Sequence, residues 1–289
     1  MCDHHDHHHN GHDHHHDGQV HDEKAVDRRA FLTTGVAAGA AAAVVATASL
    51  ARAHHDPDAY APPAKGALPD TGFKLNRERA ALVVTDPQVD FLSPKGVTWK
   101  VVGASVEHHD TVANIGRLFA AAKSADMLTA ISPHYYYPTD HGWSFGGPLE
   151  KLMHAIGMFD RASPYETSGF DGSGADFMPE YKQYIHDGKT IITSPHKVYG
   201  PEQNDLVLQL RKNHIDQVIL AGMSANLCVE SHLRELLEQG FEVAVVKDAT
   251  AAAMLPEGDG YQAAIVNFRY IANALWSTDE AVGEILGKA

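Results

Sequence analysis

Three side chains that are able to perform acid–base and nucleophilic chemistry stand just beyond short apolar runs of this sequence: Asp86, Lys197 and Cys228. The thiolate is the nucleophilic form of cysteine, and an ordinary cysteine is mostly protonated at neutral pH unless a nearby cation or a helix N-terminus lowers its pKa. We therefore predict that Cys228 is a nucleophile, that Lys197 supplies the cation, and that Asp86 accepts the thiol proton and later returns it to a leaving amine.

The elements that must position these residues alternate between strand and helix. Apolar runs rich in β-branched residues predict strands at 80–85, 127–132, 190–193, 217–221 and 241–246, with a further edge strand at 274–276. Helical periods lie between them, and the last predicted helix spans 261–271. This order predicts an α/β fold, a three-layer αβα sandwich with a mostly parallel sheet, in which ligands bind beyond the carboxyl ends of the strands.

Composition and motifs exclude several classes of function. The formal net charge of -14 argues against a nucleic-acid-binding surface. The sequence contains neither a G-x-G-x-x-G nor a G-x-x-x-x-G-K-[ST] motif, so we expect no nucleotide and no other cofactor.

Two stretches of the sequence resemble the isochorismatase-like cysteine hydrolases, a family that includes nicotinamidases and ureidoacrylate- and biuret-type amidohydrolases. The stretch after the first strand carries the pattern D-x-Q-x-D-F, and a second stretch leads into the helix after Cys228. The matching residues are Asp86, Gln88, Asp90 and Phe91 in the first stretch and Gly222, Asn226, Cys228 and Val229 in the second. The resemblance covers residues 77 to about 275.

The resemblance implies a Rossmann-like parallel sheet of six strands and an Asp86/Lys197/Cys228 triad. It also implies a cis peptide bond before Ser224, which would aim the backbone N–H groups of Ser224 and Cys228 into an oxyanion hole. The expected activity is hydrolysis of the C–N bond of a small amide or ureide through a cysteine acyl-enzyme. Two alternatives are a vinyl-ether hydrolase of the isochorismatase type and a non-catalytic periplasmic protein that binds or sequesters metal.

The predicted substrate pocket is aromatic. An insertion over residues 135–181 is rich in Tyr, Phe and Trp. It is expected to form a lid or an oligomer contact, and the alternative is the ordinary packing of a large loop. We predict that the substrate-binding side chains are Phe91, His134, Tyr136 and Trp143.

No resident metal ion is predicted for the catalytic domain. Nicotinamidases carry a metal-binding D-x-H after the second strand, and Ser132 replaces the aspartate here. His134, Asp140 and His141 are the alternative zinc ligands, but polar lining of the pocket is the preferred interpretation.

The N-terminal part of the chain reads as a leader followed by an export signal. Residues 1–26 are rich in His and Asp, and we predict that they are disordered. Two interpretations stay open for them: loose metal binding, and a solvated leader without a specific role. Residues 27–53 combine paired arginines, an uncharged Ala-rich run and an A-x-A site, as in a cleaved twin-arginine signal peptide. Residues 54–76 are a predicted linker or surface arm, and 77–289 form the hydrolase domain.

These features predict export by the twin-arginine machinery to the periplasm or the extracellular space, without a permanent membrane anchor. The predicted partners are a small amide substrate and, by resemblance to relatives, further copies of the chain in a homo-oligomer. Cleavage would remove Cys2 and leave Cys228 as the one cysteine, so no internal disulfide is expected.

Overall fold

The structure is a computed structural model that describes residues 61–288. The predicted leader and signal peptide therefore lie outside the described residues. Of residues 61–288, no helix is long and apolar enough to cross a membrane.

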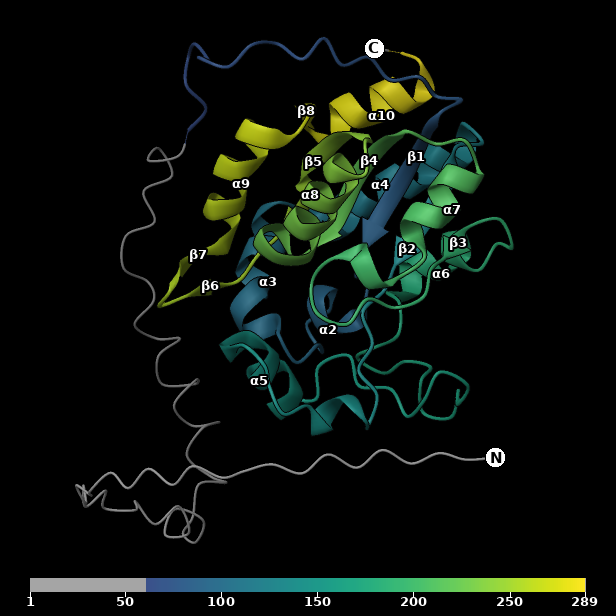
Figure 1. The fold of residues 1–289 in the computed structure, drawn as a ribbon, viewed down its shortest axis with the longest axis vertical. Coiled ribbons are helices and arrows are strands. Elements are labelled where there is room, and N and C mark those ends of the chain that lie inside the picture. Colours follow the sequence, from purple (N-terminus) through teal and green to yellow (C-terminus); the bar gives the residue numbers. More distant parts are fainter. Residues whose placement is uncertain (1–60, 289) are drawn as a thin grey trace, which may run out of the picture. The chain divides into compact units, whose positions relative to one another are not determined.

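A sheet of six parallel strands forms the centre of the described structure (Figure 1). Its strands are β1 (Ala80–Thr85), β2 (Leu128–Ser132), β3 (Ile191–Ile192), β4 (Gln217–Met223), β5 (Glu242–Ala251) and β8 (Ala274–Trp276). They are arranged in the order β3-β2-β1-β4-β5-β8, and every neighbouring pair runs parallel. This confirms the predicted fold class, although β4 and β5 extend further than the sequence indicated and β3 is shorter.

Helices cover both faces of the sheet. One face packs against α3 (Trp99–His108), α4 (Thr111–Ser124) and α10 (Thr278–Leu286), and the other against α7 (Leu206–Lys212), α8 (Glu230–Glu238) and α9 (Gly260–Ile271). Strand β1 shows why: every one of its side chains is buried, and they alternate between the two faces. Leu82 and Val84 point into the first apolar layer, while Ala81 and Val83 point into the second.

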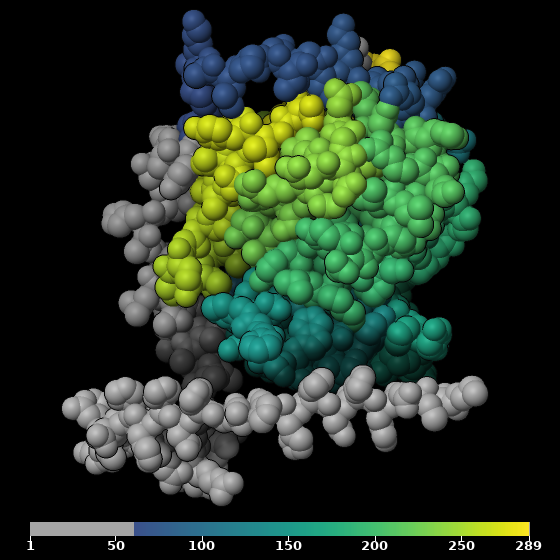
Figure 2. All heavy atoms as spheres, in the orientation of Figure 1, coloured from purple at the N-terminus to yellow at the C-terminus, as the bar shows by residue number. Residues whose placement is uncertain are grey.

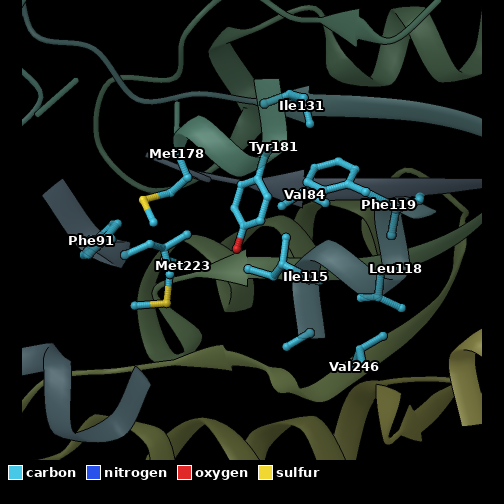
Figure 3. Packing of buried hydrophobic residues seen from close by; sticks show 14 of the residues in the cluster. Val84, Phe91, Ile115, Leu118, Phe119, Ile131, Met178, Tyr181, Met223 and Val246 are labelled. Atoms are coloured by element: carbon cyan, nitrogen blue, oxygen red, sulfur yellow. The ribbon is translucent and has the colours of Figure 1, made fainter. Parts of the chain in front are cut away.

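The first apolar layer is filled largely by aromatic and branched side chains, and Figure 3 shows part of it. Tyr181 lies among Phe119, Ile115 and Val84, and its hydroxyl donates a hydrogen bond to the carbonyl oxygen of Val112 at 2.8 Å. The end of the aromatic insertion therefore belongs to the core of the domain and anchors the rest of the insertion to it.

Shorter elements surround the carboxyl end of the sheet. They are the helices α2 (Val89–Leu92), α5 (Pro148–Ala155) and α6 (Lys182–Ile185), and the ribbon of β6 (Met254–Leu255) and β7 (Gly258–Asp259). In Figure 1, α2 and α5 lie beyond the end toward which β1 points, and Figure 2 shows the teal atoms of this region forming one end of the described surface. The carboxyl end of the sheet is therefore covered by these short connecting elements.

The segment before β1 lies against the edge strand β8. The hydroxyl of Thr71 donates to the carbonyl oxygen of Asn273, and the rings of Phe73 and Trp276 lie 5.5 Å apart. Further along, the amide of Asn76 donates to the side chain of Gln217. Residues 71–76 are thus attached to the domain surface as an arm.

Candidate active site

The carboxyl ends of the three central strands meet in register. Thr85 at the end of β1 pairs with Ser132 at the end of β2 and with Gly222 near the end of β4. The N–H of Asp86 continues the ladder by donating to the carbonyl oxygen of Ser132 at 3.0 Å. Residues that follow these strands in distant parts of the sequence are therefore held side by side.

Gly222 allows β4 to approach β1 this closely. Its φ is +115°, and a Cβ at this position would lie 2.0 Å from the carbonyl oxygen of Thr85. Only glycine combines this backbone conformation with this contact. The strand end therefore has to carry glycine for the stretch leading to Cys228 to begin beside Asp86.

Four potentially reactive side chains meet beyond the strand ends: Asp86, His134, His196 and Cys228. One donor atom from each of them lies within 4.8 Å of the donor atoms of the other three. Asp86, His134 and His196 are 0% exposed, and Cys228 is 3% exposed. The structure thus builds a dry cluster of one carboxyl, two imidazoles and one thiol.

Of the predicted triad, the structure brings Asp86 and Cys228 together and leaves Lys197 out. The ammonium Nζ of Lys197 lies 2.5 Å from Oδ2 of Asp140, donates to the carbonyl oxygen of Tyr135 and stacks on the ring of Tyr137. The predicted role of Lys197 as the cation beside the thiol is therefore not supported by the contacts of its ammonium group. Instead, Nε2 of the preceding residue, His196, lies 2.8 Å from Oδ1 of Asp86.

His196 takes the place expected for Lys197 because the two residues lie in extended backbone, where neighbouring side chains point to opposite sides. The backbone after β3 continues the parallel ladder, since His196 bridges to His134 and its N–H donates to the carbonyl oxygen of Pro133. Successive side chains of an extended backbone point to opposite sides, so His196 faces the cluster and Lys197 faces away from it. The sequence shows an imidazole next to the lysine. Which of the two side chains faces Asp86 could be decided only from the pairing of this segment with the segment after β2.

Cys228 lies in a π-helical turn, Ala225–Val229, that leads directly into α8. Burial raises the pKa of its thiol well above the ordinary value, and the neighbouring charge of Asp86 raises it further. The backbone N–H groups of Ser224 and Cys228 act in the opposite direction, because they lie close enough to stabilise the thiolate and lower its pKa. The peptide bond between Met223 and Ser224 is cis, as the resemblance implied.

A neutral histidine, His232, forms a hydrogen bond with the backbone of the nucleophile. Nδ1 of His232 lies 2.6 Å from the carbonyl oxygen of Cys228, so this nitrogen carries the proton, and Nε2 accepts from the hydroxyl of Ser132 at 2.8 Å. The hydroxyl of Ser132 in turn accepts from Asn204. Burial, followed by the neighbouring His196, lowers the pKa of His232 to about 3. Ser132 therefore holds His232 in place by a hydrogen bond. His232 was not among the residues predicted from the sequence.

The other polar residues of the first motif are structural. The side-chain amide of Gln88 donates to the carbonyl oxygens of His134 and Ala175, and its oxygen accepts from the N–H of His134. The carboxylate of Asp90 accepts from the N–H of Phe159 at 2.7 Å. These bonds attach the loop after β2 and the aromatic insertion to the loop after β1, which holds His134 in the cluster.

The four predicted pocket residues occupy different environments. His134 belongs to the cluster itself, while Phe91 is packed in the core with its ring 5.2 Å from that of Phe159. Tyr136 is buried beside His134, and its hydroxyl is close enough to Cys228 for the thiolate charge to raise the pKa of Tyr136, after the larger effect of burial. Trp143 is 40% exposed and contacts the edge of Tyr136.

The three alternative zinc ligands are not brought together as a group. Asp140 pairs with Lys197, and Nε2 of His141 lies 2.8 Å from Oδ1 of Asp160. His134 instead faces His196, with ring centroids 4.6 Å apart.

Comparison with known proteins agrees with the motifs. Residues 80–280 match the model of the Isochorismatase domain. A ureidoacrylate amidohydrolase from Variovorax paradoxus is 28% identical over 208 residues, which are 67% of this chain and 77% of that protein.

Solved structures show the same fold. A cysteine hydrolase from Pseudomonas syringae superposes with a TM-score of 0.62 at 20% identity, over 78% of this chain and 100% of that one. N-carbamoylsarcosine amidase from Thermoplasma acidophilum superposes with a TM-score of 0.50 at 18% identity, over 70% of this chain and 97% of that one. The family match extends over the whole sheet and includes every member of the buried cluster, so the chain belongs to the isochorismatase domain family.

Proposed function

We propose that this protein is a cysteine hydrolase that cleaves the C–N bond of a small amide or ureide, with Cys228 as nucleophile, Asp86 as general acid and base, and His196 in the place expected for a lysine. The observation that carries the proposal is the buried contact between the carboxylate of Asp86, the imidazole of His196 and the thiol of Cys228. An acid–base group beside a nucleophile, oriented by a third group, is the arrangement that covalent catalysis requires.

In the first half of the reaction, Asp86 takes the thiol proton and the thiolate attacks the substrate carbonyl carbon. The resulting oxyanion accepts hydrogen bonds from the N–H groups of Ser224 and Cys228, the same groups that lower the pKa of the thiol by stabilising its thiolate. Protonated Asp86 then gives its proton to the leaving nitrogen, the C–N bond breaks, and a thioester remains on Cys228.

In the second half, water attacks the thioester. Asp86 accepts a proton from this water, the C–S bond breaks, and the proton returns to the sulfur. His196 orients Asp86 throughout, because the hydrogen bond from its Nε2 holds Oδ1 and leaves Oδ2, which has no hydrogen-bond partner among the described residues, free to exchange protons. His196 is thus a positioning residue in this scheme.

The substrate class we propose is a small ureide. A ureidoacrylate amidohydrolase and an N-carbamoylsarcosine amidase both act on molecules with a terminal carbamoyl group, and this chain resembles the first in sequence and the second in fold. Cleavage of such a group by the scheme above releases ammonia or an amine. Because Cys228 is 3% exposed, substrate reaches it only when the side chains above it move. We propose Tyr136, from the aromatic insertion, as one of those side chains, because it is close enough to Cys228 for the thiolate charge to raise the pKa of Tyr136.

We also propose that the protein is exported by the twin-arginine route. The support is the pattern of residues 27–53, which places paired arginines before an uncharged segment and an A-x-A site. A domain that forms no disulfide is suited to a route that carries folded proteins.

The test is a panel of N-carbamoyl compounds, simple amides and vinyl ethers, incubated with the full chain and with Cys228→Ser, with ammonia and organic products measured. We expect ammonia from one or more ureides, no turnover by Cys228→Ser, and a covalent adduct on Cys228 by mass spectrometry when the reaction is quenched early. Cleavage of a vinyl ether that survives in Cys228→Ser would instead establish the isochorismatase-type alternative.

A further inference from the structure

The four side chains of the buried cluster also have the composition of a transition-metal site. We infer that Asp86, His134, His196 and Cys228 bind one divalent ion of the zinc class, and that the loaded protein is an inactive form of the hydrolase. The inference goes beyond the proposed function, because binding depends on the geometry of the cluster and not on turnover.

The first support is the donor set. One thiolate, two imidazoles and one carboxylate are the ligand types that zinc takes in proteins, with bonds of about 2.0 to 2.3 Å. Ligand atoms around a tetrahedral zinc ion are then about 3.3 to 3.8 Å apart, which follows from those bond lengths. The four donor atoms lie within 4.8 Å of one another, so side-chain rotations that change the widest separation by about 1 to 1.5 Å bring them to an ion.

The second support is that the cluster contains polar atoms without partners. Oδ2 of Asp86, Nδ1 of His134 and Nδ1 of His196 are buried and have no hydrogen-bond partner among the described residues. Buried polar groups are normally satisfied, and three exceptions in one cluster indicate a missing group. An ion at the centre of the cluster would satisfy Asp86 and His134 directly.

The third support is the way in which His134 is held. Its Nε2 lies 2.9 Å from the carbonyl oxygen of Lys197, so this nitrogen carries the proton and Nδ1 presents a lone pair to the cluster. A metal-binding histidine typically donates its other ring N–H to a backbone carbonyl or a carboxylate in this manner. The imidazole is therefore oriented and protonated as a ligand before any ion arrives.

Charge and space agree with a small cation. Lys197, which follows His196 in the chain, pairs with Asp140, so its ammonium is not the partner of Asp86 or of a thiolate at Cys228. A divalent ion with one carboxylate and one thiolate makes a neutral group, which suits a site with 0% exposure at three of its members. Binding replaces the thiol proton: the S–H bond breaks, the proton leaves to solvent, and the sulfur–metal bond forms.

Metal binding would prevent Cys228 from acting as a nucleophile. Four protein ligands close a tetrahedral zinc site and leave no position for water or substrate. The same sulfur cannot attack a carbonyl while it is bound to the ion, and Asp86 cannot accept a proton while it is a ligand. Metal binding and hydrolysis are therefore expected to be mutually exclusive.

The site differs from the zinc ligands weighed from the sequence. Asp140 and His141 are not members, because each is paired elsewhere. His134 is the one residue that both sets share, which makes His141 a matched control for it.

The test uses cobalt(II) as the probe and the full chain carrying Cys2→Ser, so that Cys228 is the one thiol present. Histidines of the leader bind cobalt without a thiolate, and a thiolate-to-cobalt charge-transfer band in the near ultraviolet therefore reports Cys228 alone. We expect the band to saturate at the intensity of one cobalt–thiolate bond per chain once the leader histidines are also loaded, to disappear in Cys228→Ser, and to require at least about 100-fold more free cobalt in His134→Phe, a larger loss than that of an outer-shell partner. His141→Phe should leave the titration unchanged.

A second measurement, zinc-dependent thermal stabilisation, tests the site without the His134 variant, which could fail to fold. Zinc should raise the unfolding temperature of the Cys2→Ser chain more than that of its Cys228→Ser derivative. Absence of the band in the Cys2→Ser chain, or a band that His134→Phe leaves unchanged, would overturn the inference. A band without ureide turnover would leave the metal site in place and contradict the hydrolase, whereas turnover that zinc in excess over the leader histidines does not inhibit would contradict the metal site alone.

Discussion

Nε2 of His196 lies 2.8 Å from Oδ1 of Asp86, and both side chains are completely buried. This contact places an imidazole where the family resemblance implied a lysine. The acid–base group is thereby oriented by a hydrogen bond from a ring that is itself held in the backbone ladder after β3.

The first prediction separates His196 from its neighbour Lys197. His196→Ala should lower kcat/KM for the best ureide by about 100-fold or more, because it removes the group that orients the general acid and base. Lys197→Met should lower the free energy of unfolding, since Asp140 loses its partner, while turnover persists. Steady-state kinetics and urea unfolding of both variants provide the measurements. A larger loss of turnover in Lys197→Met than in His196→Ala would restore the original triad.

The second prediction concerns the opposite effects of Asp86 on thiol ionisation and on turnover. The charge of Asp86 raises the pKa of Cys228, so Asp86→Asn should increase the thiolate fraction at pH 7 to 8 and speed alkylation by iodoacetamide. The same variant should lose at least about 100-fold in turnover, because the proton carrier is gone. Asp140→Asn, which pairs with Lys197, is the matched control and should leave alkylation of Cys228 unchanged. Slower alkylation of Asp86→Asn would contradict this electrostatic account.

The third prediction uses two buried tyrosine hydroxyls. The hydroxyl of Tyr136 has no hydrogen-bond partner among the described residues and lies near Cys228, so Tyr136→Phe should raise KM without lowering stability. The hydroxyl of Tyr181 donates to Val112, so Tyr181→Phe should cost about 1 kcal/mol of unfolding free energy and leave KM unchanged. If Tyr136→Phe destabilises the fold and leaves KM as it was, Tyr136 is packing and not part of the substrate pocket.

The fourth prediction tests the close approach of β4 to β1. Gly222→Ala should destabilise the protein by about 3 kcal/mol or more, because an added Cβ meets the carbonyl oxygen of Thr85 and the backbone has a φ of +115°. Gly188 has a φ of +75° with nothing within 4 Å of an added Cβ, so Gly188→Ala should cost about 1 kcal/mol from conformation alone. Chemical unfolding of both variants gives the difference, and equal costs would show that the strand ends have room to separate.

The fifth prediction is a loss of stability in acid that originates from His232. Its pKa is about 3 in the folded protein, against about 6.5 for an ordinary histidine, so only the unfolded chain takes up this proton between those values. The contribution is fully present above about pH 6.5 and falls by up to about 1.4 kcal/mol for each pH unit below it, down to about pH 3. His232→Asn, which retains a donor toward the Cys228 carbonyl, should be less stable at neutral pH and show a shallower slope.

Unfolding of both proteins in the presence of a chelator, between pH 4 and pH 8, measures that slope. It should be reduced and not abolished, because burial also lowers the pKa of His134 well below its ordinary value. Parallel pH profiles for the two proteins would show that His232 does not carry this linkage.

The sequence by itself determined the family and the parallel sheet, and it named three of the four members of the buried cluster: Asp86 and Cys228 as catalytic residues and His134 as a pocket residue. Apolar runs separated by helical periods allow few alternatives to a covered parallel sheet, and Asp86 and Cys228 stand in motifs whose local backbone carries them to the strand ends. The export signal and the substrate-binding residues remain predictions.

Only the tertiary structure decided which of two adjacent nitrogen-bearing side chains meets Asp86. His196 and Lys197 are adjacent, and a shift of one residue along an extended backbone exchanges the side that each faces. That choice is made by the pairing of His196 with His134, two segments that lie far apart in the sequence. The same pairing assembles the four buried donors, which no local pattern of residues could indicate because their closeness depends on the register of three strands.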